Sequence, residues 1–253
     1  QFTGVPTGTV TTSSTLVVTD LEPGTYTATE VNPAPDFDVT AVRCDDGESA
    51  TSSSGDPQTR TAVFNLDRDE TVTCIFTNTQ RGTAVLTSLT LPDGTAGQFA
   101  YTGVPSGTVP ADGTLVTAHL RPGTYTSTQV DPVPNFDLVA VDCDDGASAT
   151  VSMGDPTTRS AIFQIDPGEM VNCIFTNARR GTVIVAVDIS PEDASGAISF
   201  TGVPSGTVSA GSELVVTDLP PGTYTTTASD RESDFELLDV TCDDSASPAS
   251  SSG

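Results

Sequence analysis

The chain has no lysine and no tryptophan, and its 253 residues include a single histidine. The nine basic residues, all arginines, stand against 34 acidic ones, so the formal net charge is −25. This balance argues against nucleic acid as a partner, because binding there requires cations that replace counterions. No run of apolar residues is long enough to span a bilayer, so we expect no membrane span.

The scarcity of histidine also argues against an enzyme. Catalytic triads and most acid–base sites depend on this residue, and the only one in the chain is His119. The positions 99 residues before and after it hold Asp20 and Asp218, so we expect His119 to face solvent. The sequence therefore predicts no catalytic residues.

Three phrases recur at a fixed interval of 99 residues. Thr-Gly-Val-Pro begins at Thr3, Thr102 and Thr201, Pro-Gly-Thr-Tyr begins at Pro23, Pro122 and Pro221, and Cys-Asp-Asp begins at Cys44, Cys143 and Cys242. A period held by independent markers indicates tandem copies of one structural unit. We expect three copies, called repeat one (residues 1–80), repeat two (81–180) and repeat three (181–253).

Only repeat two contains the whole unit. By comparison with it, repeat one lacks its first strand and repeat three lacks the C-terminal hairpin that would carry a second cysteine. Two explanations stay open: the sequence is a window in a longer repetitive polypeptide, or neighbouring copies supply the missing strands.

The cysteines follow the same period. Cys44 and Cys74 are 30 residues apart, as are Cys143 and Cys173, while the partner expected for Cys242 lies outside the chain. One pair per repeat predicts one disulfide per domain and an extracellular or cell-surface setting. Zinc is the alternative, but no Cys-x-x-Cys spacing is present and one histidine cannot serve every repeat.

Alternation of apolar and polar residues predicts strands throughout the unit. Residues 161–165 and 171–175 alternate in this way, and the turn signal Asp-Pro-Gly-Glu between them predicts a hairpin. In residues 37–44 the apolar positions change phase, which a bulge would reconcile with one core. Residues 83–91 supply the first strand. With about seven strands per 99-residue repeat and no 3.6-residue period, the pattern predicts an all-β, antiparallel β-sandwich.

Residues 21–30, Leu-Glu-Pro-Gly-Thr-Tyr-Thr-Ala-Thr-Glu, resemble a known signature. It is the Leu-x-Pro-Gly-x-Tyr-x-x-x-Glu pattern of prealbumin-like domains in bacterial surface proteins and pilins, relatives of the collagen-adhesin B-type repeats. The closing Cys-Ile-Phe-Thr-Asn is similar to that family's Phe-x-Asn ending. The resemblance implies tandem prealbumin-like or immunoglobulin-like sandwiches that serve as stalk or backbone modules of adhesins and fibres.

Many members of that family carry a Lys–Asn isopeptide bond promoted by the signature acid. Glu30 stands at the position of the acid in repeat one, but Gln129 and Ala228 replace it later. Asn78 and Asn177 stand where an acceptor asparagine is expected. Because the chain has no lysine, this chemistry is excluded, and the resemblance implies that the disulfide is the substitute staple.

Acidic residues directly after the first cysteine of each repeat are candidates for calcium ligands. They are Asp45, Asp46, Asp144, Asp145, Asp243 and Asp244. Calcium takes six to eight oxygen ligands, which adjacent carboxylates and loop carbonyls can supply. No loop has calcium-hand spacing, and a solvated acidic surface that keeps chains apart explains the same residues. Calcium is thus the one candidate cofactor, and both readings stay open.

These features predict a structural repeat protein that builds an extracellular fibre, pilus-like filament or surface stalk from disulfide-stapled sandwiches. Its expected partners are identical or successive copies of itself. The alternative is an adhesin-type module whose loops recognise a surface molecule, a glycan or a mineral. Near-identical loops in the copies favour the structural role, because a receptor site usually occupies one specialised domain.

Overall fold

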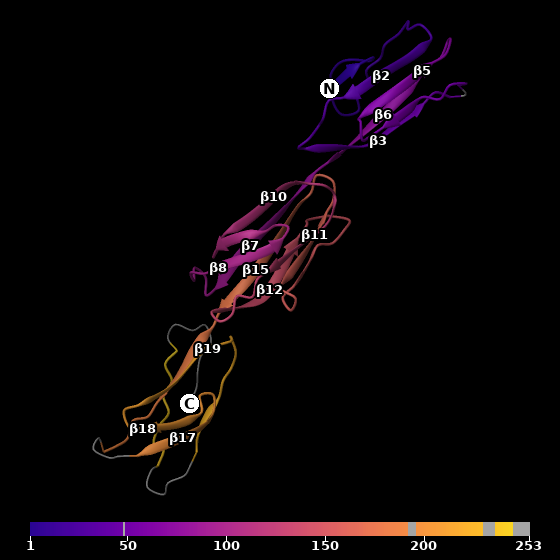
Figure 1. The fold of residues 1–253 in the computed structure, drawn as a ribbon. Helices are drawn as coiled ribbons and strands as arrows, with labels where there is room; N and C mark the ends of the chain where they lie inside the picture. Colours follow the sequence, from indigo (N-terminus) through magenta and orange to yellow (C-terminus); the bar gives the residue numbers. More distant parts are fainter. Residues whose placement is uncertain (48, 192–195, 230–235, 245–253) are drawn as a thin grey trace. The chain divides into compact units, whose positions relative to one another are not determined.

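The structure is a computed structural model that describes residues 1–253 except 48, 192–195, 230–235 and 245–253 (Figure 1). The described residues form strands and no helix, so no helix among them is long and apolar enough to cross a membrane. They divide into two compact units, residues 1–179 and 180–253. The predicted all-β class is confirmed.

The strands follow the repeats. Repeat one contains β1 (Phe2–Gly4), β2 (Gly24–Glu30), β3 (Phe37–Asp45), β4 (Ser54–Asp56), β5 (Thr61–Leu66) and β6 (Thr73–Gln80). Repeat two contains β7 (Gly82–Leu91), β8 (Gln98–Gly103), β9 (Gly107–Pro110), β10 (Thr114–Leu120), β11 (Gly123–Gln129), β12 (Phe136–Asp144), β13 (Met153–Asp155), β14 (Ser160–Ile165) and β15 (Met170–Arg179). The second unit contains β16 (Gly181–Ala186), β17 (Ala197–Gly202), β18 (Gly206–Ser209), β19 (Glu213–Leu219) and β20 (Thr226–Ser229).

Repeat two is a sandwich of two sheets, with strand orders β10-β7-β15-β12 and β13-β14-β11-β8-β9. It has more strands than the seven expected, because β9 and β13 are too short to show an alternating pattern. All pairings are antiparallel except that of β7 with β15, which is parallel from Met170↔Thr83 to Ala178↔Leu91. The first and last strands of the unit therefore lie side by side.

The core of repeat two lies between these sheets. Alternate residues of β7 and β15 point inward, so that Leu86, Val171 and Phe175 are completely buried together with Phe163 from the opposite sheet. The outward residues of the same strands are half-exposed. Buried and half-exposed residues thus alternate with the two-residue period that the sequence predicts, and the buried faces of the two sheets pack against each other.

One predicted connection is wrong. The residues before and after Asp-Pro-Gly-Glu do not form a hairpin, because β14 pairs with β11 and β13, whereas β15 pairs with β7 and β12. The turn is closed by Glu169, whose N–H donates to the Asp166 carbonyl and whose Oε2 accepts from the Asp166 N–H. This turn carries the chain from one sheet to the other. The residues of a turn do not show whether the next strand joins the same sheet or the opposite one.

The predicted bulge is confirmed. The register of β3 on β6 shifts between Val39 and Ala41, and that of β12 on β15 shifts between Leu138 and Ala140. The extra residue moves the inward positions by one, so that the apolar residues on both sides of it face the same core.

The recurring phrases mark two structural devices. The tyrosine of each Pro-Gly-Thr-Tyr donates its hydroxyl hydrogen bond to the carbonyl four residues earlier: Tyr26 to Glu22 at 2.8 Å, Tyr125 to Arg121 at 2.9 Å and Tyr224 to Pro220 at 2.7 Å. In Thr-Gly-Val-Pro, Gly103 has φ +93° and a Cβ on it would lie 2.1 Å from the Thr126 carbonyl oxygen. Only glycine allows β8 and β11 to approach so closely there.

The other repeats contain parts of the same sandwich. Repeat one has the sheets β1-β2-β5-β4 and β3-β6, and the second unit has β18-β17-β20 and β16-β19. The pair β3-β6 corresponds to β12-β15, and the pair β16-β19 corresponds to β7-β10. Each described sheet of two strands is thus one half of the four-stranded sheet of repeat two.

Candidate functional site

The disulfides join adjacent strands of one sheet. Cys44 on β3 lies opposite Cys74 on β6, and Cys143 on β12 lies opposite Cys173 on β15. The S–S distances are 2.06 and 2.03 Å, and the Cα atoms of each pair are 4.0 Å apart. Each disulfide therefore fastens the last strand of its repeat to the edge strand of the same sheet. Cys242 is exposed and carries no disulfide within the described residues.

The acidic residues after the first cysteine organise their own loops. Asp45 accepts from the Gly47 N–H at 3.1 Å through Oδ1, and Asp144 accepts from the Gly146 N–H at 2.9 Å in the same way. The neighbouring Asp46 accepts from the Ser53 N–H. Asp145 accepts in the same manner from the Ser152 N–H. Backbone donors thus occupy one oxygen of each carboxylate.

The structure does not gather these carboxylates into a common site. Among the residues that the structure describes, no three His, Cys, Asp or Glu side chains lie close enough together to hold a metal ion. Asp243 and Asp244 fall within the described part of repeat three but outside its strands. Calcium at these positions therefore stays an untested alternative to a solvated acidic surface.

A buried polar cluster lies between the sheets of repeat two. Gln129 donates from Nε2 to Asn177 Oδ1 at 2.7 Å, and Asn177 Nδ2 lies 3.3 Å from Ser88 Oγ. All three residues are at most 1% exposed. The sequence pointed to Gln129 and Asn177 but not to Ser88, which lies in the middle of β7 in an ordinary alternating pattern. Only the parallel pairing of β7 and β15 shows that it belongs to the cluster.

Tyr101 on β8 lies beside this cluster, and its buried hydroxyl has no hydrogen-bond partner among the described residues. Burial raises the pKa of Tyr101 to about 12, although the neighbouring Ser88 and Asn177 side chains oppose the rise in part. Its ring packs edge-on against Phe175 with the centroids 5.0 Å apart. The cluster contains neutral groups alone at ordinary pH, so it acts as a hydrogen-bonded link between β7, β11 and β15.

Repeat one carries a modified and more open version. Asn78 Nδ2 donates to Glu30 Oε2 at 3.2 Å, and Glu30 is 6% exposed while Asn78 is exposed. Phe2 stands at the position of Tyr101 and packs against Phe76 with the ring centroids 4.8 Å apart. In repeat three Ala228 stands at the position of Gln129, so the cluster changes from copy to copy.

The neighbour of Asn177 on the first strand of repeat two is a hydroxyl. It belongs to Ser88 on β7, whose Oγ lies 3.3 Å from Asn177 Nδ2. Since the chain has no lysine, Asn177 has no amine within this sequence with which to form an isopeptide bond. The covalent link of repeat two is the disulfide, on the same strand β15.

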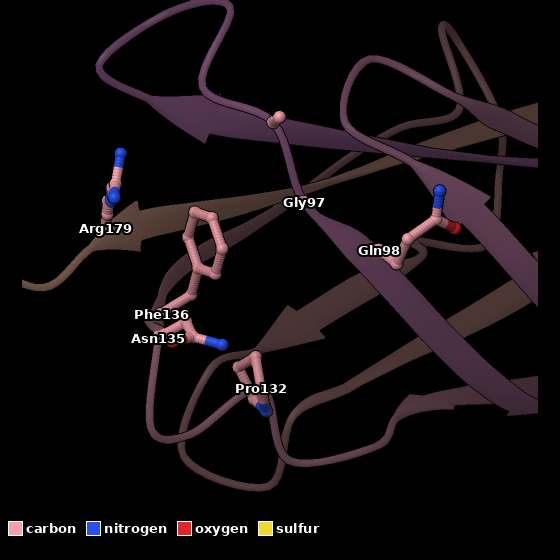
Figure 2. Close-up of a pocket in the computed structure, with 7 residues that line it drawn as sticks. Gly97, Gln98, Pro132, Asn135, Phe136 and Arg179 are labelled. Carbon is pink, nitrogen blue, oxygen red and sulfur yellow. The ribbon is translucent and has the colours of Figure 1, made fainter.

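A surface hollow with a volume of about 440 Å³ lies at one end of repeat two (Figure 2). The ring of Phe136 points toward Gly97, where a Cβ would lie 3.1 Å from it. The lining residues are Ala96, Gly97, Gln98, Pro132, Asn135, Phe136 and Arg179. Their one charged side chain is Arg179, and none of the sequence-predicted site residues lies there.

A sequence model of the prealbumin-like fold domain matches residues 1–80 and 87–179. The chain belongs to this family. The two matched segments coincide with repeat one and most of repeat two, whose sheets are described above. The resemblance seen in the Pro-Gly-Thr-Tyr block is therefore confirmed, and this prealbumin-like chain keeps the tyrosine of that block in all three copies.

Comparisons with curated sequences and solved structures give only distant matches. No curated protein sequence matches the prealbumin-like chain. Among solved structures, the Bacillus anthracis TIE protein is 14% identical with a TM-score of 0.31, over 75% of this chain and 42% of that protein. A streptococcal ancillary pilin is also 14% identical with a TM-score of 0.29, over 86% of this chain and 75% of the pilin. The chain thus spans less than half the length of the TIE protein.

Proposed function

We propose that this prealbumin-like chain is a non-enzymatic structural repeat protein of an extracellular fibre, pilus-like filament or surface stalk. The observation that carries the proposal is the joint between repeats one and two. There β6 ends at Gln80 and β7 begins at Gly82, so a single residue separates the last strand of one sandwich from the first strand of the next. A joint of this length leaves no slack for independent domains.

The disulfides and the charge support the same role. A disulfide in each of the first two repeats suits an oxidising setting outside the cell, where no chaperone refolds a domain that has opened. The net charge of −25 keeps neighbouring fibres apart in solution. Neither feature requires a ligand, which distinguishes this proposal from a binding module.

The free edge of β6 supports assembly by strand addition. In repeat two, β15 pairs with β12 on one side and with β7 on the other, whereas β6 pairs with β3 alone among the described strands. Ile75 on β6 is 63% exposed. We infer that this edge accepts a strand with the sequence pattern of β7, from the same polypeptide or from a neighbouring copy.

Electron microscopy of the purified native material tests the proposal. Uniform beaded filaments or stalks are the expected result. Dispersed monomers that bind a glycan, a mineral or another surface molecule would replace the proposal with the adhesin-type module.

A peptide with the sequence of residues 82–91 tests the strand-accepting edge. We expect it to slow amide hydrogen exchange along β6 of the full chain, because each added pairing protects N–H groups there. A peptide with Leu86→Asp is the matched control, since it places a charge at a completely buried position of the strand. Equal protection by both peptides, or none by either, would contradict strand addition at this edge.

A further inference from the structure

Arg81, the single residue between β6 and β7, is held by repeat one. Its guanidinium donates to both oxygens of Asp38, from Nε at 2.8 Å and from Nη2 at 2.7 Å. Its backbone N–H donates to the Asp36 carbonyl at 2.8 Å. A planar guanidinium that meets a carboxylate with two parallel hydrogen bonds fixes direction as well as distance. The position of the linker residue relative to β3 is therefore defined.

Repeat two reaches the same carboxylates from the other side of the joint. Arg121 Nη2 lies 3.3 Å from Asp38 Oδ1, and His119 Nδ1 lies 3.4 Å from Asp36 Oδ1. Arg81 also donates from Nη1 to the His119 carbonyl at 3.4 Å. One carboxylate, that of Asp38, thus binds an arginine of the linker and an arginine of repeat two.

A backbone contact lies beside this cluster. The Gly168 N–H, in the turn between β14 and β15, donates to the Gln80 carbonyl at 3.2 Å. Gly168 has φ +76°, and a Cβ there would lie 2.7 Å from Gln80 Oε1. The turn of repeat two therefore approaches the last residue of β6 closely, with a backbone conformation at Gly168 that favours glycine.

The charge balance makes the cluster unusual in this chain. Only nine basic residues oppose 34 acidic ones, yet two arginines and the single histidine converge on two aspartates here. Asp38 and Arg81 are each about one-fifth exposed, so water and salt screen their contact less than a surface ion pair. The Arg81 guanidinium holds the pKa of Asp38 below its ordinary value.

We propose that Asp36, Asp38, Arg81, His119 and Arg121 form an ionic clamp that fixes repeat two in one orientation on repeat one. A single isolated pair at a surface contributes little, but several charges that share one carboxylate define a geometry that no single pair can. The short connection limits the distance between the two repeats, and the clamp in addition fixes the orientation of one repeat relative to the other.

Part of this arrangement recurs in the sequence. In the second unit Arg180 stands at the position of Arg81, and its Nη1 donates to the Asp218 carbonyl at 3.2 Å. Asp218 and Pro220 stand where repeat two has His119 and Arg121. The set of five residues is therefore complete at the first joint only, which makes Arg121 the residue whose removal tests the clamp most selectively.

The experiment measures a distance distribution across the joint of the full chain. Nitroxide labels at Gln58→Cys and Thr157→Cys, both exposed and in equivalent loops of the two repeats, are placed in a Cys242→Ser background. Pulsed electron paramagnetic resonance then reports how widely the distance between the labels varies. The variant Arg121→Gln removes the contact from repeat two and keeps the pair of Arg81 with Asp38.

We expect a narrow distance distribution in the parent and one about twofold broader in Arg121→Gln. Roughly 1 M salt should broaden the parent distribution by the same factor, because the screening length falls to ~3 Å there. Arg81→Gln should broaden it further. The matched control is Arg159→Gln, which removes an arginine 3.7 Å from Asp131 within repeat two and should change nothing. A parent distribution that is already broad, or a width that Arg121→Gln leaves unchanged, would overturn the proposal. Because the Arg121 side chain is 72% exposed, loss of folding does not obscure this variant.

Discussion

All six strands described in repeat one have a counterpart in repeat two, yet the sheet that carries the disulfide has two strands in repeat one and four in repeat two. Residues of the same type at equivalent positions of the two repeats differ in burial. Cys173 and Phe175 are completely buried, whereas Cys74 and Phe76, at the same places on β6, are half-buried. Burial in this fold is therefore set by the neighbouring strand β7 and not by the residues of the last strand themselves.

The asparagine of the polar cluster also differs between the two repeats. With β7 in place, Asn177 is fully buried and bonded to groups from two other strands. In repeat one no described strand lies at the position of β7. Asn78 is exposed there, and its side chain donates a hydrogen bond to Glu30. Among the described residues, this asparagine therefore bonds to groups on two neighbouring strands in repeat two and to Glu30 in repeat one.

Removal of a disulfide should have the largest effect. Cys143→Ala with Cys173→Ala should lower the free energy of unfolding of repeat two by about 3–4 kcal/mol, because the unfolded chain regains the freedom of a long loop. Urea unfolding followed by the amide signals of repeat two measures this. Under mild reductant the Cys44–Cys74 bond, with both cysteines half-buried, should open before the Cys143–Cys173 bond, in which Cys173 is completely buried. Equal rates in a mass-spectrometric time course would contradict the comparison, and free thiols in native material would contradict the disulfides themselves.

The asparagines should separate the repeats next. Asn177→Ala should destabilise repeat two by about 1–3 kcal/mol, because it leaves the buried Gln129 amide without its partner. Asn78→Ala, at an exposed position, should change repeat one by less than about 0.5 kcal/mol. Hydrogen exchange of the amides of each repeat, compared between each variant and the parent, measures both losses of stability. Similar losses in the two repeats would mean that Asn78 is as enclosed as Asn177.

The tyrosines provide a change to which both repeats should respond equally. Tyr26→Phe and Tyr125→Phe each remove one hydrogen bond to a carbonyl four residues earlier, and each should cost about 1 kcal/mol. This corner does not involve β7 or its absence. A clearly larger loss in one repeat, by the same exchange measurement, would show that the open sheet weakens distant parts of the sandwich.

Acid should weaken the link between the repeats. The pKa of Asp38 is lowered by Arg81, so the stabilisation is fully present above the ordinary aspartate pKa of about 3.9 and is lost as the pH falls through the lowered value. A carboxylate-detected titration by NMR should place the midpoint of Asp38 below the ordinary aspartate pKa. The same titration on Arg121→Gln should raise the Asp38 midpoint, and an unchanged midpoint would exclude a contribution from Arg121.

A chelator should have the smallest effect. Asp45, Asp46, Asp144 and Asp145 already accept hydrogen bonds from loop N–H groups, so we expect the same thermal midpoint with and without chelator. Calcium bound to the native state would instead raise the midpoint when it is present, since it stabilises the form that binds it. A lower midpoint after chelation would therefore favour the calcium sites over a solvated acidic surface.

Much of the fold could be predicted from the sequence, because its period and its alternation are both strong. The bulge near Val39 followed from a change of phase in the apolar residues, and the Pro-Gly-Thr-Tyr block indicated the family. The connection after β14 was mispredicted, because a turn signal reports a reversal of direction and not the sheet that receives the next strand.

The polar cluster could be predicted only in part. Gln129 and Asn177 were identified through the family signature, but Ser88 and Tyr101 carry no local signal, since each occupies an ordinary inward position of its strand. Ser88 reaches Asn177 through the parallel register of β7 on β15, and Tyr101 lies opposite Gln129 through the pairing of β8 with β11. Both are long-range pairings that no short window of sequence contains. The ionic clamp was missed for the same reason, because Asp38 and Arg121 are far apart in the chain and only the joint brings them together.

The parallel register of β7 on β15 also determines how repeat two responds to stretching. The chain enters this pair at Gly82 and leaves it at Arg179, and nine register pairs run between the two strands. A force that draws these two ends apart acts along the strands and in opposite directions on each, so the hydrogen bonds are loaded in shear and must fail together. A hairpin of the same size would unzip one bond at a time and yield at a much lower force.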